Sequence, residues 1–291
     1  MVPLLSQLKN NLQKELNVII LCAGKGTRIK TKNPSIPKAL IKIKEFDNKP
    51  ILEIVLDLLL KSEKINQVWI VTGYLGEKIE SFVAKLTSTN KSMGTKLRLI
   101  NAIHNYEKGP LFSLLTVASN HQINNNQTYL TIPGDTIYDE ELLDTVLSII
   151  TTHFKSKSAI PAIFYRVLNE SNIQKLSDPK QEVKIINTVT VKENGIILEF
   201  LENISEITLK SPKKGKNIKQ LYPFFAFDYD FFMHLVNVAP KKKIKTIYRA
   251  LNEVKKEYKV QAYKIENKGS FFDIDTNKDL KALSKKKKSG Q

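Results

Sequence analysis

A short loop rich in glycine and positive charge follows the apolar run Val18–Cys22. Gly24 and Gly26 allow backbone N–H groups to approach a ligand closely, and Arg28 adds positive charge. Such a loop after a buried strand suits a polyphosphate, although a tight turn without a ligand is the alternative. Its spacing matches neither the Walker A motif nor the G-x-G-x-x-G dinucleotide motif. The other loop residues expected to contact such a ligand are Ala23, Lys25 and Thr27.

These residues need a framework, and the sequence pattern predicts an α/β sheet. From Asn17 to residue 155, short apolar runs alternate with segments of helical periodicity. This alternation is typical of a largely parallel sheet that helices cover on both faces. Ligands bind beyond the carboxyl ends of the strands in such sheets, and the glycine-rich loop lies at that position.

The second part of the chain has a different pattern. After Ser158 extended segments predominate, namely AIPAIFYRVL, VKIINTVTV, GIILEFLEN and LYPFFAFDYDFF, and helical patterns return at TIYRALNEVKKE and NKDLKALSKK. We therefore expect one domain over residues 17–284, with a first half (17–155) and a second half (156–284) that adds a β-rich substrate region. A basic tail occupies residues 285–291.

Leucines at every fourth position begin the chain and predict an amphipathic helix over residues 1–16. We expect this helix to pack on the surface of the domain rather than to bind a membrane or a partner. The leucines concerned are Leu4, Leu8, Leu12 and Leu16.

The composition favours an anionic partner and a reducing compartment. The formal net charge of +17 suits phosphates, nucleic acid or an acidic membrane surface, but lysine runs such as PKKKIK and SKKKKSG are typically solvated. No apolar stretch reaches the roughly 18 residues that span a bilayer, and no signal peptide is recognisable, so we expect no membrane insertion. The single cysteine, Cys22, excludes a disulfide framework and favours the cytoplasm. We expect Cys22 to be a small buried packing residue.

Four motifs resemble, in order and spacing, those of the nucleotidyltransferase family that includes sugar-phosphate pyrophosphorylases and MobA-like NTP transferases. They are LCAGKGTR with the following PKALIKI and KPILEIVLDLL, then TIPGDTIYD, VTVKENGIILEFLEN and FFDIDTNKDLKAL, and together they cover residues 17 to 285. The last motif is typical of cytidylyltransferases that act on phosphocholine or inositol phosphate. The resemblance implies a three-layer Rossmann-like (GT-A-like) fold with a mixed, mostly parallel sheet, and transfer of a nucleoside monophosphate from an NTP to a phosphorylated sugar, polyol or amino alcohol.

The resemblance makes residues 17–155 the nucleotide-binding half and residues 156–284 the acceptor-binding half, and it implies roles for individual residues. Arg28 would clamp the β- and γ-phosphates of the NTP with help from Lys25, and Lys38 would lie at the α-phosphate. Asp135 and Asp275 would hold Mg²⁺, which takes hard oxygen ligands. Asp273 is the alternative to Asp275.

The motifs define the sites for the nucleotide base and for the phosphorylated acceptor less closely. Gly109 and Ser113 occupy the place where the family contacts the base, and CTP is favoured over GTP and UTP. Glu202 belongs to the acceptor-binding half, but Asn203 follows it where the family commonly has a lysine. The candidates for a replacement cation are Lys210, Lys213 and Lys214. The pattern leaves the oligomeric state open.

Two other classes of function remain as alternatives. One is a catalytically silent pyrophosphorylase-like subunit, against which the joint presence of Arg28, Lys38, Asp135 and Asp275 argues. The other is a nucleic-acid-binding protein, which the charge suggests, although neither a recognised nucleic-acid-binding motif nor aromatic residues within the lysine runs accompany it. We therefore expect no specific nucleic-acid partner.

Overall fold

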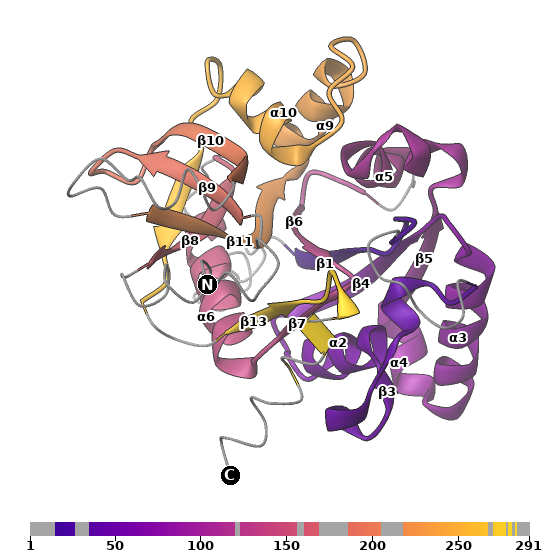
Figure 1. Ribbon diagram of the computed structural model, residues 1–291. Coiled ribbons are helices and arrows are strands. Elements are labelled where there is room, and N and C mark those ends of the chain that lie inside the picture. Colours follow the sequence, from indigo (N-terminus) through magenta and orange to yellow (C-terminus); the bar gives the residue numbers. More distant parts are fainter. Residues whose placement is uncertain are drawn as a thin grey trace, which may run out of the picture.

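The computed structural model describes residues 15–26, 35–119, 123–155, 160–168, 186–204, 218–266, 270–277, 279–280 and 283. A nine-stranded sheet crosses both halves, in the order β10-β9-β11-β6-β1-β4-β5, with β8 beside β11 and β12 beside β8 (Figure 1). The sheet is mixed and helices flank it, which confirms the expected α/β fold. No helix within these residues is long and apolar enough to cross a membrane.

Parallel strands form the nucleotide-binding half of the sheet. Strand β1 lies in the middle and pairs in parallel with β4 on one side and β6 on the other, so that Val18 is opposite both Val68 and Leu130. The strands are β1 (Glu15–Leu21), β4 (Ile65–Thr72), β5 (Leu97–Asn101) and β6 (Gln127–Pro133). Two-residue strands β2 (Lys42–Ile43) and β3 (Lys49–Pro50) pair with each other.

Helices surround these strands. The α-helices are α2 (Ile51–Leu60), α3 (Gly76–Thr89), α4 (Lys91–Lys96), α5 (Pro110–Leu115) and α6 (Glu140–Lys155). Short 3₁₀ turns are η1 (Lys38–Leu40), η2 (Lys44–Phe46), η3 (Ile103–Lys108) and η4 (Thr116–Ser119).

Antiparallel pairing dominates the acceptor-binding half. Strand β11 (Ile218–Asp228) is antiparallel to β6, β8 and β9, and thereby joins the two halves. The other strands of this half are β8 (Ala162–Leu168), β9 (Ile186–Val191), β10 (Ile197–Ile204) and β12 (Gln261–Lys264). Strand β10 pairs with β9, and β12 pairs with β8. Helices α9 (Tyr229–Val238) and α10 (Ile247–Val254) follow β11.

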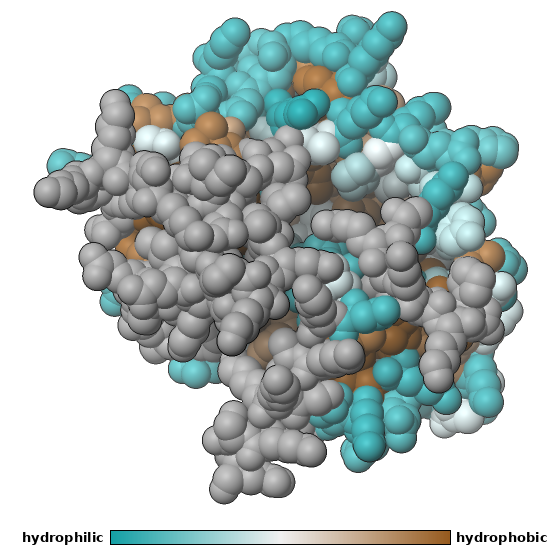
Figure 2. Space-filling view, viewed as in Figure 1, coloured by the Kyte–Doolittle hydropathy of each residue, from teal (hydrophilic) through white to brown (hydrophobic). Residues whose placement is uncertain are grey.

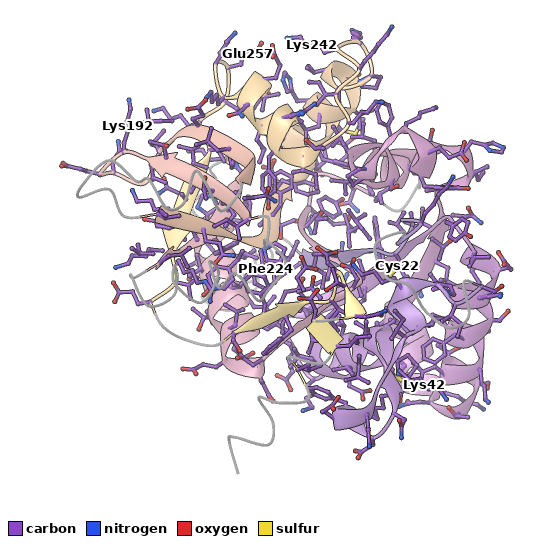
Figure 3. The ribbon with its side chains drawn as sticks, viewed as in Figure 1. Cys22, Lys42, Lys192, Phe224, Lys242 and Glu257 are labelled. Carbon is purple, nitrogen blue, oxygen red and sulfur yellow. The ribbon has the colours of Figure 1, made fainter. Side chains whose placement is uncertain are left out.

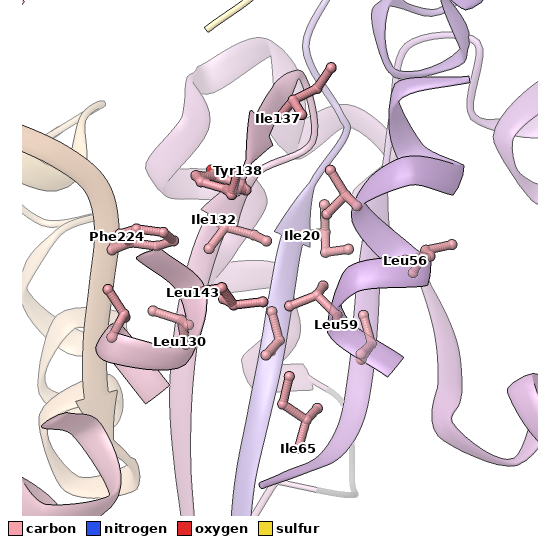
Figure 4. Close-up of a cluster of buried hydrophobic side chains, with 14 of the residues drawn as sticks. Ile20, Leu56, Leu59, Ile65, Leu130, Ile132, Ile137, Tyr138, Leu143 and Phe224 are labelled. Atoms are coloured by element: carbon pink, nitrogen blue, oxygen red, sulfur yellow. The ribbon is translucent and has the colours of Figure 1, made fainter. Parts of the chain in front are cut away.

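Side-chain alternation along β1 fills a core on each face of the sheet. Ile20 packs on the face that α2 and α6 cover, together with Leu56 and Ile132 (Figure 4). Ile19 points to the other face, where α5, α9 and α10 supply the neighbours. Both isoleucines are fully buried, which explains the nearly continuous apolar run of this strand.

The structure differs from the sequence-based expectation at the start of the domain. Strand β1 begins at Glu15, so Glu15 and Leu16 belong to the sheet rather than to the end of a helix. Leu16 is buried, and Glu15 pairs with Gln127 of β6. The rest of the predicted helix, residues 1–14, lies outside the described residues.

Helix α9 and a small second sheet were not predicted. The segment YDFF was expected to continue an extended strand, but the side chain of Asp228 accepts a hydrogen bond from the Phe231 N–H at 3.1 Å and starts a helix there.

The second sheet pairs β7 (Thr136–Tyr138) with β13 (Phe271–Asp273) in antiparallel fashion. Strands of three residues carry too little periodicity to be recognised from sequence.

Candidate functional site

The glycine-rich loop lies at the carboxyl end of β1, as expected. The N–H of Cys22 still donates to the carbonyl of Val71 on β4 at 2.8 Å, and the chain then leaves the sheet. Gly26 has a φ of 59°, and a Cβ atom there would lie 3.1 Å from Cβ of Lys38. A Cβ atom on Gly24 would meet no atom within 4 Å, so this part of the loop borders open space. Thr27 and Arg28 lie outside the described residues.

Lys38 makes the strongest polar contacts of the site. Pro37 has an extended backbone and precedes the 3₁₀ turn η1, which begins at Lys38. The Lys38 side chain is only 10% exposed, and its Nζ atom lies 2.6 Å from Oδ2 of Asp135 and 2.7 Å from Oδ1 of Asp275. The Pro-Lys pair therefore places an ammonium group between the two acidic residues that the resemblance singled out.

The β7–β13 ribbon brings the acidic residues together. Asp273 pairs with Thr136 across the ribbon, and the N–H of Ile274 donates to the carbonyl of Asp135 at 3.2 Å. Asp135, Asp273 and Asp275 each offer a carboxylate oxygen, and these oxygens lie within 4.8 Å of one another. Both proposed alternatives for the second acidic residue thus belong to one cluster with Asp135.

The electrostatics keep Lys38 charged. Burial lowers the pKa of its ammonium group, but the charges and hydrogen bonds of Asp135 and Asp275 outweigh burial and raise the pKa above the ordinary lysine value. The cluster holds three carboxylates and one ammonium group, and the oxygens of Asp135 and Asp275 already converge on that cation. This donor set fits Mg²⁺, which prefers hard oxygen ligands.

A cavity of about 400 Å³ adjoins the glycine-rich loop and the cluster. Ser113, a buried residue within α5, also lines this cavity. Cys22, which is buried, also lines the cavity and is labelled in Figure 3, as is Phe224 on β11. The cavity lining also includes Ala23, Gly24, Gly26, Lys38, Asp135, Tyr106 and Pro110.

Sequence reasoning missed Tyr106 and Pro110 as cavity residues. An aromatic residue shortly before a Gly-Pro helix start is the signal that was available, because it places a ring beside an exposed helix N-terminus. Gly109 itself does not line the cavity. It has a φ of 121°, and a Cβ atom there would lie 2.8 Å from the carbonyl oxygen of Lys245. Its role is therefore to let the loop before α10 approach α5.

The remaining predicted residues lie away from the cluster or outside the described residues. Lys25 is about half exposed, and its Nζ atom is 3.8 Å from Glu107 at the surface. The backbone of Glu202 belongs to β10, but its side chain is outside the described part of the structure. The same holds for the whole of Lys210, Lys213 and Lys214.

Comparison with known proteins identifies the family. Residues 18–254 match the MobA-like NTP transferase domain. The D-glycero-alpha-D-manno-heptose 1-phosphate guanylyltransferase of Campylobacter jejuni is 26% identical over 189 residues, which cover 65% of this chain and 69% of that protein. The choline-phosphate cytidylyltransferase of Haemophilus influenzae is 28% identical over 200 residues, which cover 68% of this chain and 79% of that protein.

A solved structure of UDP-glucose pyrophosphorylase complexed with UDP-glucose superimposes with a TM-score of 0.68 at 16% identity, covering 94% of this chain and 99% of that chain. This similarity concerns the fold. The chain belongs to the family of MobA-like NTP transferases, and the predicted nucleotidyltransferase class and Rossmann-like fold are thereby confirmed. The two relatives are named for different nucleotides, so their names do not assign a base to this chain.

Proposed function

We propose that the protein transfers a nucleoside monophosphate from an NTP to the phosphate group of a small phosphorylated molecule and releases pyrophosphate. The observation that carries this proposal is the cluster of Lys38 and three carboxylates at the edge of the cavity that the glycine-rich loop borders. The names of the family and of its relatives support the same reaction.

The reaction needs positioning and charge neutralisation more than proton transfer. An oxygen of the acceptor phosphate attacks the α-phosphorus and forms a new P–O bond, while the bond from the α-phosphorus to the bridging oxygen breaks and its electron pair leaves with pyrophosphate. The acceptor phosphate is already an anion at neutral pH, so the site requires no general base. Lys38 binds the α-phosphate, where charge is redistributed during the reaction, and the loop N–H groups bind the other phosphates.

Asp135, Asp273 and Asp275 would hold Mg²⁺, and the ion would neutralise charge on the phosphates. We rank Asp275 above Asp273 as the second ligand beside Asp135. For the nucleotide we favour CTP over GTP and UTP because the FFDIDT motif is typical of cytidylyltransferases. We also propose a cytoplasmic location, which the single cysteine supports.

The experiment that tests the proposal is a pyrophosphate-release screen of four NTPs against phosphorylated sugars, polyols and amino alcohols, with and without Mg²⁺. Asp135→Asn should lower kcat by at least about a hundredfold without unfolding the protein. Asp144→Asn is the matched control, since Asp144 is exposed on α6. Normal turnover by the Asp135 variant would remove this residue from the site, and NTP binding without any pyrophosphate release would favour a silent subunit.

A further inference from the structure

Arg166 is a largely buried cation in the acceptor-binding half, and neither the motifs nor the mechanism above uses it. It lies near the end of β8, opposite Gln220 of β11, and its Nε atom donates to Oε1 of Gln220 at 2.9 Å. The carbon of its guanidinium group lies 6.0 Å from the ring centre of Tyr222 and 5.5 Å from that of Phe271. We call these four residues the Arg166 cluster.

Most N–H donors of the Arg166 guanidinium group have no hydrogen-bond partner in the part of the chain that the structure describes. Its N–H donors form a planar fork that matches an oxyanion, yet only Nε has a hydrogen-bond partner within the described residues, and no carboxylate there forms an ion pair with it. Burial lowers the pKa of the group, because desolvation disfavours its charged form. A buried charge without a counter-ion is costly, and a ligand with the opposite charge would offset that cost.

The Arg166 cluster lies next to the site. Phe271 begins β13, and Asp273 of the carboxylate cluster ends the same strand. Two residues along a strand correspond to about 7 Å. Strand β11 pairs with β6 from Phe225 onward, so its first residues, which include Tyr222, extend past the end of β6, where Asp135 follows. The cluster is therefore a neighbour of the carboxylates and not a part of them.

We propose that Arg166 binds a negatively charged group of the acceptor, at the end of the molecule remote from the phosphate that reacts. This inference rests on the proposed function and narrows the acceptor to a phosphorylated molecule that carries a second anion, such as a carboxylate. The rings of Tyr222 and Phe271 pack against each other at 5.4 Å between centres, and the guanidinium group lies beside both rings, where cation–π attraction stabilises it. A quaternary ammonium group, as in phosphocholine, would meet a like charge and bind poorly there.

Two matched pairs of acceptors test the inference, because the members of each pair differ by one carboxylate. They are glucuronate 1-phosphate against glucose 1-phosphate, and phosphoserine against phosphoethanolamine. We expect the wild-type protein to bind the carboxylate member of at least one pair about tenfold more tightly, both in KM and in calorimetric titration. Arg166→Met should abolish this preference by raising KM, while kcat and the KM for NTP change less than about threefold.

Lys219→Met is the matched control for Arg166→Met. Lys219 is the neighbour of Gln220 on β11, but it points to the opposite face, where its Nζ atom lies 5.8 Å from the ring centre of Tyr165. We expect this variant to keep the carboxylate preference. Arg166→Met should also keep or raise the melting temperature, because it removes a largely buried charge that has no ion-pair partner among the described residues. A marked fall in melting temperature with unchanged acceptor preference would instead assign Arg166 a purely structural role and overturn the inference.

The outcomes separate this inference from the proposed function. A carboxylate preference in the titrations without pyrophosphate release would support the inference and contradict the proposed function. Pyrophosphate release with equal KM values within both pairs, or with phosphocholine as the preferred acceptor, would contradict the inference and support the function. Absence of both binding and release with all four acceptors would overturn the inference.

Discussion

Among individual residues, Lys38 offers the sharpest test of the mechanism. Its ammonium group contacts two carboxylates in the structure and is proposed to bind the α-phosphate during reaction. We expect Lys38→Ala to lower kcat by about thirtyfold to a thousandfold, because a charge-assisted contact to the transition state is worth roughly 2 to 4 kcal/mol. Steady-state kinetics with both substrates varied would measure this effect.

Two further variants control for the assignment of Lys38. Lys38→Arg should restore only part of the activity, since a planar fork does not replace a compact ammonium group. Arg28→Ala should mainly raise the KM for NTP, because Arg28 is expected to contact phosphates that carry their charge before the reaction begins. If Lys38→Ala retains its kcat and only weakens NTP binding, Lys38 belongs to the phosphate clamp instead.

Gly134 is a second residue whose replacement has a clear expected result. A Cβ atom on Gly134 would lie 2.2 Å from Sγ of Cys22, so Gly134→Ala forces a shift where β1 and β6 end. We expect a loss of about 1 to 3 kcal/mol in the free energy of unfolding, measured by denaturant titration.

Removing the sulfur atom of Cys22 should relieve most of that loss. The nearest remaining atom would then be the carbonyl oxygen of Leu21 at 3.1 Å, which needs only a small adjustment. The double variant Cys22→Ala with Gly134→Ala should therefore be more stable than Gly134→Ala alone. If the losses of unfolding free energy in the two single variants add up in the double variant, the overlap with Cys22 is not what makes glycine necessary at position 134.

At the level of elements, the contact between α5 and the loop before α10 links the two halves at the cavity. The N–H of Leu111 donates to the carbonyl of Lys245 at 3.1 Å, and Gly109 packs against the same carbonyl. Gly109→Ala combines this overlap with an unfavourable positive φ and should destabilise the protein by about 1 to 3 kcal/mol. The KM for NTP should rise as Ser113 shifts with α5.

Gly94→Ala provides the control for Gly109→Ala. Gly94 lies in α4, and a Cβ atom there would meet its nearest neighbour, in Thr87, at 3.6 Å, an ordinary contact. We expect this variant to be as stable as the wild type or more stable by up to about 1 kcal/mol, since alanine favours a helix over glycine. Thermal melts and NTP titrations of both variants would compare them, and equal effects would mean that the α5 contact has no special role.

The long elements of this protein could be predicted from sequence, whereas the short ones that complete the site could not. Apolar periodicity located β1, β4 and β6 because these strands are buried on both faces. The three-residue strands β7 and β13 depend on pairing between distant segments, which one sequence does not reveal. Helix α9 was missed because aromatic residues favour strands in isolation, while the capping contact of Asp228 decides for a helix.

The same contrast applies to the site residues. Asp135, Lys38 and the glycine-rich loop belong to motifs with fixed spacing, and the structure does bring Asp135 and Lys38 together. Arg166 is one cation within an apolar strand, and only the packing of β8, β11 and β13 around it makes it conspicuous. Arg166 is a candidate anion site because it has no carboxylate partner within the described residues. No local sequence pattern reveals that property.

For the whole molecule, the net charge of +17 could be mistaken for a sign of nucleic-acid binding, although much of it lies in lysine runs that are expected to be solvated. Figure 2 shows hydrophilic side chains over α9 and α10, and lysines 241–243 and 245 lie in the loop between these helices.

Deleting residues 285–291, which lie outside the described part of the chain, should change kcat/KM by less than about threefold, because a charged chain end is usually solvated. Pyrophosphate-release kinetics of the shortened protein would measure this. A large loss would mean that the tail contacts a phosphate of the substrate.

The β7–β13 ribbon also determines the order in which the carboxylate cluster is assembled during synthesis. A ribosome adds Lys38 and Asp135 to the chain well before Asp273 and Asp275. Until β13 emerges and pairs with β7, the nascent chain carries one carboxylate of the cluster of Asp135, Asp273 and Asp275. Under the proposed function, a nascent chain without β13 would therefore lack the complete cation site and would not consume nucleotide.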